Sequence, residues 1–307
     1  MQALLSPRSQ VVLAFAAVYL IWGSTYLAIR FVIESIPPFF MASTRFLIAG
    51  GILFALTRLQ GSEKPSLVHW RSAFIVGGLM LVGGHGAVVW AEQWLPSGLT
   101  SLLIATVPCW MVSLDSIRTK EKPVARVAVG LMIGFVGIIL LVGRAGDFGA
   151  SQIDVLGSGI VVLGALFWAS GSLYSRSAKF PSSQLAATAL EMLAGGTLLL
   201  LVSGLTGEIS RIDLAHISVL SFSSWLYLIF FGSLIGFTSY IWLLKKVNSA
   251  RVSTYAYVNP IVAMFLGWTL ANETLTLQSG IAAATILVSV ILITSHHKKE
   301  TSKKEFS

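Results

Sequence analysis

Charge is scarce in this sequence of 307 residues. Asp, Glu, Lys and Arg together make up 11% of the chain, and 55% of it is hydrophobic. A soluble domain carries about 25% charged residues. The mean hydropathy is +0.81. So few charges cannot cover the surface of a soluble core of this size, and the composition therefore predicts a polytopic membrane protein.

Cysteine is almost absent, because Cys109 stands alone. An intramolecular disulfide, a CxxC motif and a Cys/His metal cluster are therefore excluded. The neighbouring His296 and His297 lie in a charged tail, which we interpret as solvated. The chain also lacks a GxxxxGK[ST] phosphate loop, so ATP does not drive its activity. We expect no metal, no cofactor and no catalysis.

What the chain has in abundance is long apolar runs. A helix needs about 20 apolar residues to cross a bilayer, and continuous runs favour helices over the alternating strands of a barrel. The first run is too long for a signal peptide, so we expect it to be retained. The predicted spans are 11–33, 38–57, 72–91, 97–114, 127–143, 155–175, 184–203, 222–244, 252–270 and 276–295.

The basic residues are distributed unevenly between the loops. Of the 21 Lys and Arg residues, 17 follow even-numbered runs or lie at the two ends, whereas two follow odd-numbered runs. Excess Lys and Arg mark cytoplasmic loops, so both termini are predicted to be cytoplasmic. This distribution also accounts for the net charge of +8 without a nucleic-acid partner.

The two halves of the sequence repeat each other. At an offset of 146, Trp22, Ser24 and Arg30 match Trp168, Ser170 and Arg176. "RFLIAGG" from Arg45 resembles "EMLAGG" from Glu191 with one residue deleted. A second set of pairs has an offset of 152: Trp90 with Trp242, Ser97 with Ser249, Ser101 with Ser253, Pro108 with Pro260, and Glu121 with Glu273.

Each half contains five predicted spans. Because five is an odd number, the second half enters the membrane from the side opposite to the first. The fold prediction is therefore an all-α polytopic membrane protein, with ten transmembrane helices arranged as two inverted five-helix repeats. The repeats are predicted at 8–143 and 153–295, with a charged cytoplasmic tail at 296–307. In carriers built this way, the substrate site lies between the halves near the bilayer midplane.

Four stretches resemble the drug/metabolite transporter superfamily, of the EamA type. They are "YLIWGSTYLAIR" at 19–30, "PPFFMASTRFLIAG" at 37–50, "PSGLTSLLIATVP" at 96–108 and "SARVSTYAYVNPIVAMFLGWTLANETLT" at 249–276. The resemblance covers about residues 10–295. It implies ten helices, cytoplasmic termini and the transport of small metabolites, amino acids or drugs.

The favoured function is a secondary transporter in the inner (cytoplasmic) membrane of the cell, working by alternating access. Few charges among many Trp, Tyr, Ser, Thr and Asn side chains suit a neutral or amphipathic small molecule such as an amino acid, with export as the expected direction. Energy would come from the substrate gradient, exchange or a proton, and the oligomeric state stays open. The alternatives are a channel or a non-transport membrane protein. An intramembrane enzyme is less favoured because the acids and histidines are scattered.

Three charged residues lie inside predicted spans, where charge is costly and usually functional. Arg30 reaches the outer interface, where it can anchor the helix and pair with Glu34. Arg45 lies deeper and is interpreted as a binding or gating residue, with a buried ion pair as the alternative. Glu191 is its repeat mate, could carry a proton, and is expected not to pair with Arg45.

Polar and aromatic side chains complete the candidate site. Midspan indoles need hydrogen-bond acceptors, which a polar cavity provides. Prolines inside spans 4 and 9 should kink them and free carbonyls. His85 is either packed or titrating, and Glu92 is interpreted as a solvated cap. At most one of Tyr255 and Tyr257 is expected to face a cavity directly. The candidate residues for binding or gating are Trp22, Ser24, Thr25, Tyr26, Arg45, His85, Trp90, Pro108, Trp168, Ser170, Glu191, Tyr255, Tyr257, Asn259 and Pro260.

Overall fold

The computed structural model describes residues 6–95, 97–142, 155–270 and 277–294, and within them the secondary structure is helical. Glu273 and the tail from 296 lie outside these ranges. The helices of the first half are α1 Pro7–Ile33, α2 Pro38–Leu59, α3 Leu67–Val76, η1 Gly77–Gly86, α4 Ala87–Ala91, α5 Ser97–Ile104, α6 Val107–Thr119 and α7 Ala125–Val142. Those of the second half are α8 Val155–Ser177, α9 Gln184–Leu205, η3 Ile209–Arg211, η4 Leu214–His216, α10 Val219–Tyr227, η5 Leu228–Phe237, α11 Thr238–Lys246, α12 Ser249–Val252, α13 Tyr255–Leu270 and α14 Leu277–Thr294.

Within the described ranges, six helical segments are long and apolar enough to cross a membrane: Pro7–Ile33, Pro38–Leu59, Leu67–Ala91, Leu156–Ser177, Gln184–Leu205 and Val219–Lys246. Two shorter apolar helices cover Ala125–Gly137 and Gly280–Ile293. Large apolar side chains face outward, as Met132 (66% exposed) and Leu201 (59% exposed) do. Such a surface is suited to lipid and not to water.

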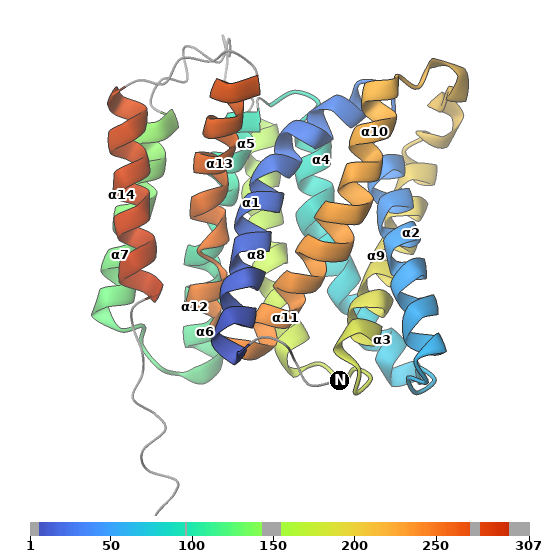
Figure 1. Cartoon of the computed structure of the whole chain (residues 1–307), viewed down its shortest axis with the longest axis horizontal. Coiled ribbons are helices and arrows are strands. Elements are labelled where there is room, and N and C mark those ends of the chain that lie inside the picture. The colour runs from blue at the N-terminus through green and yellow to red at the C-terminus, as the bar shows by residue number, and fades with distance from the viewer. Residues whose placement is uncertain (1–5, 96, 143–154, 271–276, 295–307) are drawn as a thin grey trace, which may run out of the picture.

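Helices in corresponding positions of the two halves pack in corresponding ways (Figure 1). At one edge α7 lies against α14, and at the other α2 lies against α9. Between these pairs, α1 packs against η5 and α13, and α8 packs against η1 and α5. The long helices α1 and α8 are therefore each held by elements of the opposite half.

Two helices contain ten-residue stretches of π-helix. These stretches, η1 (Gly77–Gly86) and η5 (Leu228–Phe237), occupy matching places in the two halves. A π-helix shifts each hydrogen bond to the fifth residue and is frequent at functional sites. The sequence predicted these spans as continuous α-helices, because the pattern of apolar residues does not distinguish the two helix types.

Spans 4 and 9 are interrupted, and not at equivalent points. The first breaks between Ile104 and Val107, while the second breaks between Val252 and Tyr255. Pro108 lies in the first turn of α6, directly after the break in span 4, so this proline adjoins an interruption and does not bend a continuous helix. A missing N–H costs nothing at that position. Pro260 lies inside α13 as predicted.

Candidate functional site

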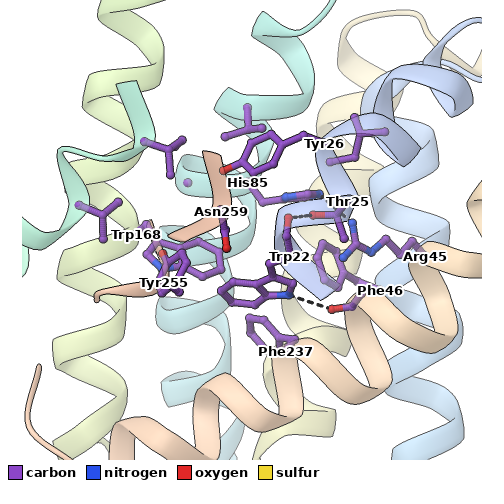
Figure 2. Close-up of a pocket in the computed structure, with 16 residues that line it drawn as sticks. Trp22, Thr25, Tyr26, Arg45, Phe46, His85, Trp168, Phe237, Tyr255 and Asn259 are labelled. Carbon is purple, nitrogen blue, oxygen red and sulfur yellow. Dashed lines mark hydrogen bonds between the residues drawn. The ribbon is translucent and has the colours of Figure 1, made fainter. Parts of the chain in front are cut away.

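A cavity lies within the helix bundle. Its wall comes from both halves: α1, α2, η1, α4, α5 and α6 from the first, and α8, η5 and α13 from the second. The lining residues are Trp22, Thr25, Tyr26, Ile29, Arg45, Phe46, Gly84, His85, Val88, Ile104, Val107, Trp168, Gly232, Phe237, Tyr255 and Asn259. Figure 2 shows the polar and aromatic members converging on the same space.

The aromatic part of the wall is built around Trp22. Its ring centroid lies 5.5 Å from that of Trp168, 5.1 Å from that of Tyr255 and 4.9 Å from that of Tyr240. Edge-to-face contacts of this kind stabilise a fixed arrangement of rings beyond simple burial. The result is a rigid apolar surface suited to a hydrophobic group of a small molecule.

Both indole N–H groups have acceptors. Trp22 Nε1 donates to the carbonyl of Gly232 at 3.1 Å, and the side chain of Thr25 donates to the Trp22 carbonyl at 2.7 Å (Figure 2). Trp168 Nε1 donates to the hydroxyl of Tyr240 at 3.1 Å. Each tryptophan is thus fixed by a residue of span 8.

Glycine makes room for each indole. A Cβ on Gly236 would lie 2.6 Å from Trp22 Nε1, and a Cβ on Gly84 would lie 2.9 Å from a ring carbon of Trp168. Both glycines belong to the π-helical stretches and differ by the same offset of 152 as the sequence repeat. Together these contacts form two matching tryptophan–glycine cradles, Trp22/Gly236 and Trp168/Gly84.

The polar part of the wall centres on Arg45, whose side chain is 3% exposed. Its Nε donates to Ser233 Oγ at 2.7 Å, and its Nη1 lies 3.5 Å from His85 Nε2. Across the cavity the Tyr26 hydroxyl faces the side chain of Asn259. The carbonyl oxygen of Asn259 is buried and has no partner within hydrogen-bonding distance among the described residues.

Eight of the predicted residues line the cavity: Trp22, Thr25, Tyr26, Arg45, His85, Trp168, Tyr255 and Asn259. The remaining seven lie elsewhere. Ser24 bonds to the Tyr227 hydroxyl and Ser170 to the Leu166 carbonyl. Trp90 packs on Trp94. Pro108 and Pro260 are buried in helices.

Tyr257 and Glu191 are also buried away from the cavity. The hydroxyl of Tyr257 donates to the Leu131 carbonyl, whereas Tyr255 lines the cavity. Glu191 is fully buried and accepts a hydrogen bond from Ser175 at 2.7 Å. Its hydrogen-bond partner is thus Ser175, whereas Arg45 donates to Ser233.

The expectation of a solvated Glu92 is wrong. Its side chain is 9% exposed, and its oxygens accept no hydrogen bond from the described residues. It interacts electrostatically with Arg30, which is itself exposed near the end of α1. The expected pair between Arg30 and Glu34 is absent from the described contacts. The π-helical stretch η1 precedes Glu92 and changes which side chains of this span face the protein interior. The sequence reasoning assumed a regular α-helix and did not include this change.

Sequence reasoning missed Phe46, Phe237, Gly232 and Ser233 as parts of the site. A sequence pattern did mark Gly232 and the nearby Gly236. Gly232 and Gly236 form a GxxxG pattern, a mark of close helix approach, and here they accommodate Arg45 and Trp22. Phe46 and Phe237 carry no comparable signal among 17 phenylalanines.

Membrane-length helices around a polar and aromatic cavity define a class, that of polytopic membrane proteins with a pocket inside the helix bundle. Comparison with known proteins shows which family within this class the chain belongs to. The EamA-like transporter family matches residues 9–143 and again residues 155–295. The chain belongs to this family, and it is a membrane transporter.

Curated relatives agree. An uncharacterized inner membrane transporter of Escherichia coli (strain K12), YedA, is 38% identical over 92% of this chain and 89% of its own. An uncharacterized transporter of Bacillus subtilis (strain 168), YoaV, is 26% identical over 93% and 97%. One crystal structure shares the fold with a TM-score of 0.75 and 19% identity, covering 96% of this chain and 100% of that chain.

Proposed function

We propose that this transporter moves small amphipathic metabolites, such as amino acids, across the cytoplasmic membrane by alternating access. The carrying observation is the central cavity, whose wall is supplied by both repeats. Aromatic rings would take the apolar part of the substrate, and Thr25, Arg45 and Asn259 its polar part.

The inverted topology, with ten spans and cytoplasmic termini, is part of this proposal. It is supported by the duplicated family match and by the two matching cradles. Two similar halves related by an axis in the membrane plane can exchange outward-open and inward-open shapes. Relative motion of the halves would break the packing of α1 on η5 and α13 and that of α8 on η1 and α5.

Polar contacts seal the bundle below the cavity, toward the beginning of α1. The Tyr19 hydroxyl meets Thr254 Oγ1 at 2.6 Å, at the break in span 9. Closer to that end, Arg176 Nη1 donates to the Val247 carbonyl at 2.9 Å, and Ser249 donates to Asp115. With the termini cytoplasmic, these contacts would form the inner gate in its closed state.

The seven candidates outside the cavity have supporting roles in this proposal. Glu191 links α9 to α8, Tyr257 links α13 to α7, and Ser170 bonds within its own helix. Pro108 and Pro260 lie in the interrupted spans. Ser24 contacts Tyr227 between α1 and α10, and Trp90 packs against Trp94 and the buried core. The substrate gradient, exchange or a proton would supply the energy, and export would be the direction.

Counterflow in proteoliposomes tests the proposal. Labelled amino acids should enter vesicles preloaded with the same unlabelled compound, with saturable kinetics and acceleration by internal substrate. Gly232→Leu would fill the space beside Arg45 and should abolish counterflow, because a Cβ there already lies 2.7 Å from Arg45 Nη2. Gly51→Leu is the matched control, since a Cβ at Gly51 meets nothing within 4 Å. Flux without saturation or trans-acceleration would instead indicate a channel.

A further inference from the structure

Arg45 is a buried cation whose described partners are neutral. Its Nε is taken by the Ser233 hydroxyl, and its Nη1 faces His85 Nε2. A guanidinium stays charged in proteins and offers five N–H donors in a planar fork. Two of those donors are engaged by these side chains, so the Nη2 side of the fork remains for a further acceptor.

No carboxylate compensates this charge within the described part of the chain. The side-chain ion pairs there join Arg118 to Asp115 and His216 to Asp213. The acid nearest the outer end of the cavity, Glu92, interacts with Arg30. Arg45 is thus buried, and no carboxylate among the described residues offsets its charge. A buried charge without a counter-charge is unfavourable, and such groups in membrane spans usually serve a function.

Arg45 lines the cavity, so an anion held there could reach its guanidinium. Glycine at position 232 lets the guanidinium pack closely against η5, because a Cβ on Gly232 would lie 2.7 Å from Arg45 Nη2. Figure 2 shows the guanidinium at the cavity wall, between Thr25 and Phe46. The rings of Trp22, Phe46 and Phe237 lie within the same wall. An anionic group and an apolar group could therefore be held together in one small molecule.

We propose that Arg45 makes this cavity selective for substrates that carry a carboxylate beside an apolar group. This inference rests on the proposed function and narrows its substrate class. The carboxylate would accept from the free side of the guanidinium fork, a geometry that favours charge-assisted hydrogen bonds. The aromatic wall would take the apolar group. Amino acids meet this description, whereas amines and amides of the same shape do not.

Three probes of one shape test the inference: 3-phenylpropanoate, 3-phenylpropanamide and 3-phenylpropan-1-amine. Their binding to the purified full chain in detergent would be followed by tryptophan fluorescence and by thermal stabilisation. We expect the carboxylate to bind at least tenfold more tightly than the amide, and the amine to bind most weakly. In Arg45→Gln the preference for carboxylate over amide should disappear, whereas Arg45→Lys should retain part of it.

Arg30→Gln is the matched control, because Arg30 is an exposed arginine outside the cavity lining and its loss should leave the preference unchanged. Equal binding of carboxylate and amide to the unmodified protein would overturn the inference, whether or not the Arg45 variants fold. A carboxylate that does not bind at millimolar concentration would also overturn it. Counterflow of an uncharged compound would then still support the proposed function, so the two failures are distinguishable.

Discussion

Glu208 and Glu63 make the same kind of contact in different surroundings. Glu208 accepts hydrogen bonds from the backbone N–H groups of Phe39 and Phe40, at the start of α2. Glu63 accepts from the backbone N–H and hydroxyl of Ser182, just before α9. Both carboxylates thus meet the positive end of a helix. Glu208 is 4% exposed, whereas Glu63 is in solvent.

The two acids are repeat mates. Gly50 and Gly195 differ by 145 in the repeat, and the same offset relates Glu63 and Glu208. Each lies in the loop that follows α2 or α9 and holds the beginning of the other of these two helices. The duplication has therefore preserved backbone contacts at two different ends of the bundle (Figure 1), while burial around them diverged.

The chemistry of the midspan side chains has diverged further. Arg45 on α2 and Glu191 on α9 also correspond, but Arg45 lines the cavity and Glu191 is sealed against Ser175. The tryptophan–glycine cradles, in contrast, are kept in both halves. Scaffold contacts have thus been retained in both copies, and the polar site has been built asymmetrically on them.

The cradles should give the largest effect. Gly84→Val and Gly236→Val each force a side chain into an indole ring, and overpacking costs about 1–3 kcal/mol or more. We expect both variants to lower the thermal midpoint by similar amounts and to abolish counterflow. Gly51→Val is the control with open space. If one cradle tolerates valine while the other does not, the equivalence of the two cradles is lost.

The second largest effect is expected from Glu208 and Glu63, whose replacement should lower the thermal midpoint by different amounts. Glu208→Ala leaves two N–H groups in a buried place without their acceptor, which costs about 1–3 kcal/mol. Glu63→Ala exposes the Ser182 groups to water, so its thermal midpoint should fall less. Differential scanning of the two variants in one detergent measures this difference. A larger loss from Glu63→Ala would show that burial does not decide the strength of these contacts.

Much of the fold could be predicted from the sequence, because span length, apolar composition and loop charge report directly on the membrane. Trp22 and Trp168 were found for a further reason, since a midspan indole needs an acceptor. Ser233 and Glu208 could not be found in this way. Their partners, Arg45 and the start of α2, are distant in sequence, and each contact depends on how the halves pack. The π-stretches were likewise not predicted, because the pattern of apolar residues does not distinguish the two helix types.

A third comparison concerns Arg45 and Glu191. Glu191→Gln keeps an oxygen to accept from Ser175, and the residue lies outside the cavity lining. We expect binding of 3-phenylpropanoate to change less than about twofold, in contrast to Arg45→Gln. The fluorescence titration described above measures both. A tenfold loss in Glu191→Gln would mean that this buried acid is coupled to the cavity, as a proton-carrying group would be.

The smallest effect is expected from the charge of Glu63, which lies in the loop between α2 and α3. Hydrogen bonds from the Ser182 backbone N–H and hydroxyl hold the pKa of this carboxyl below its ordinary value. A lowered pKa in the folded state adds stability above the unfolded pKa, and this stability is lost as the pH falls through the folded pKa. The thermal midpoint of the unmodified protein should therefore exceed that of Glu63→Gln at neutral pH, and the gap should close as the pH falls through the lowered pKa of the folded state. Glu34→Gln, which removes an exposed carboxylate without a hydrogen-bond donor among the described residues, is the control for general charge effects. A gap that stays constant down to low pH would mean that the carboxamide fits Ser182 less well and that charge contributes nothing.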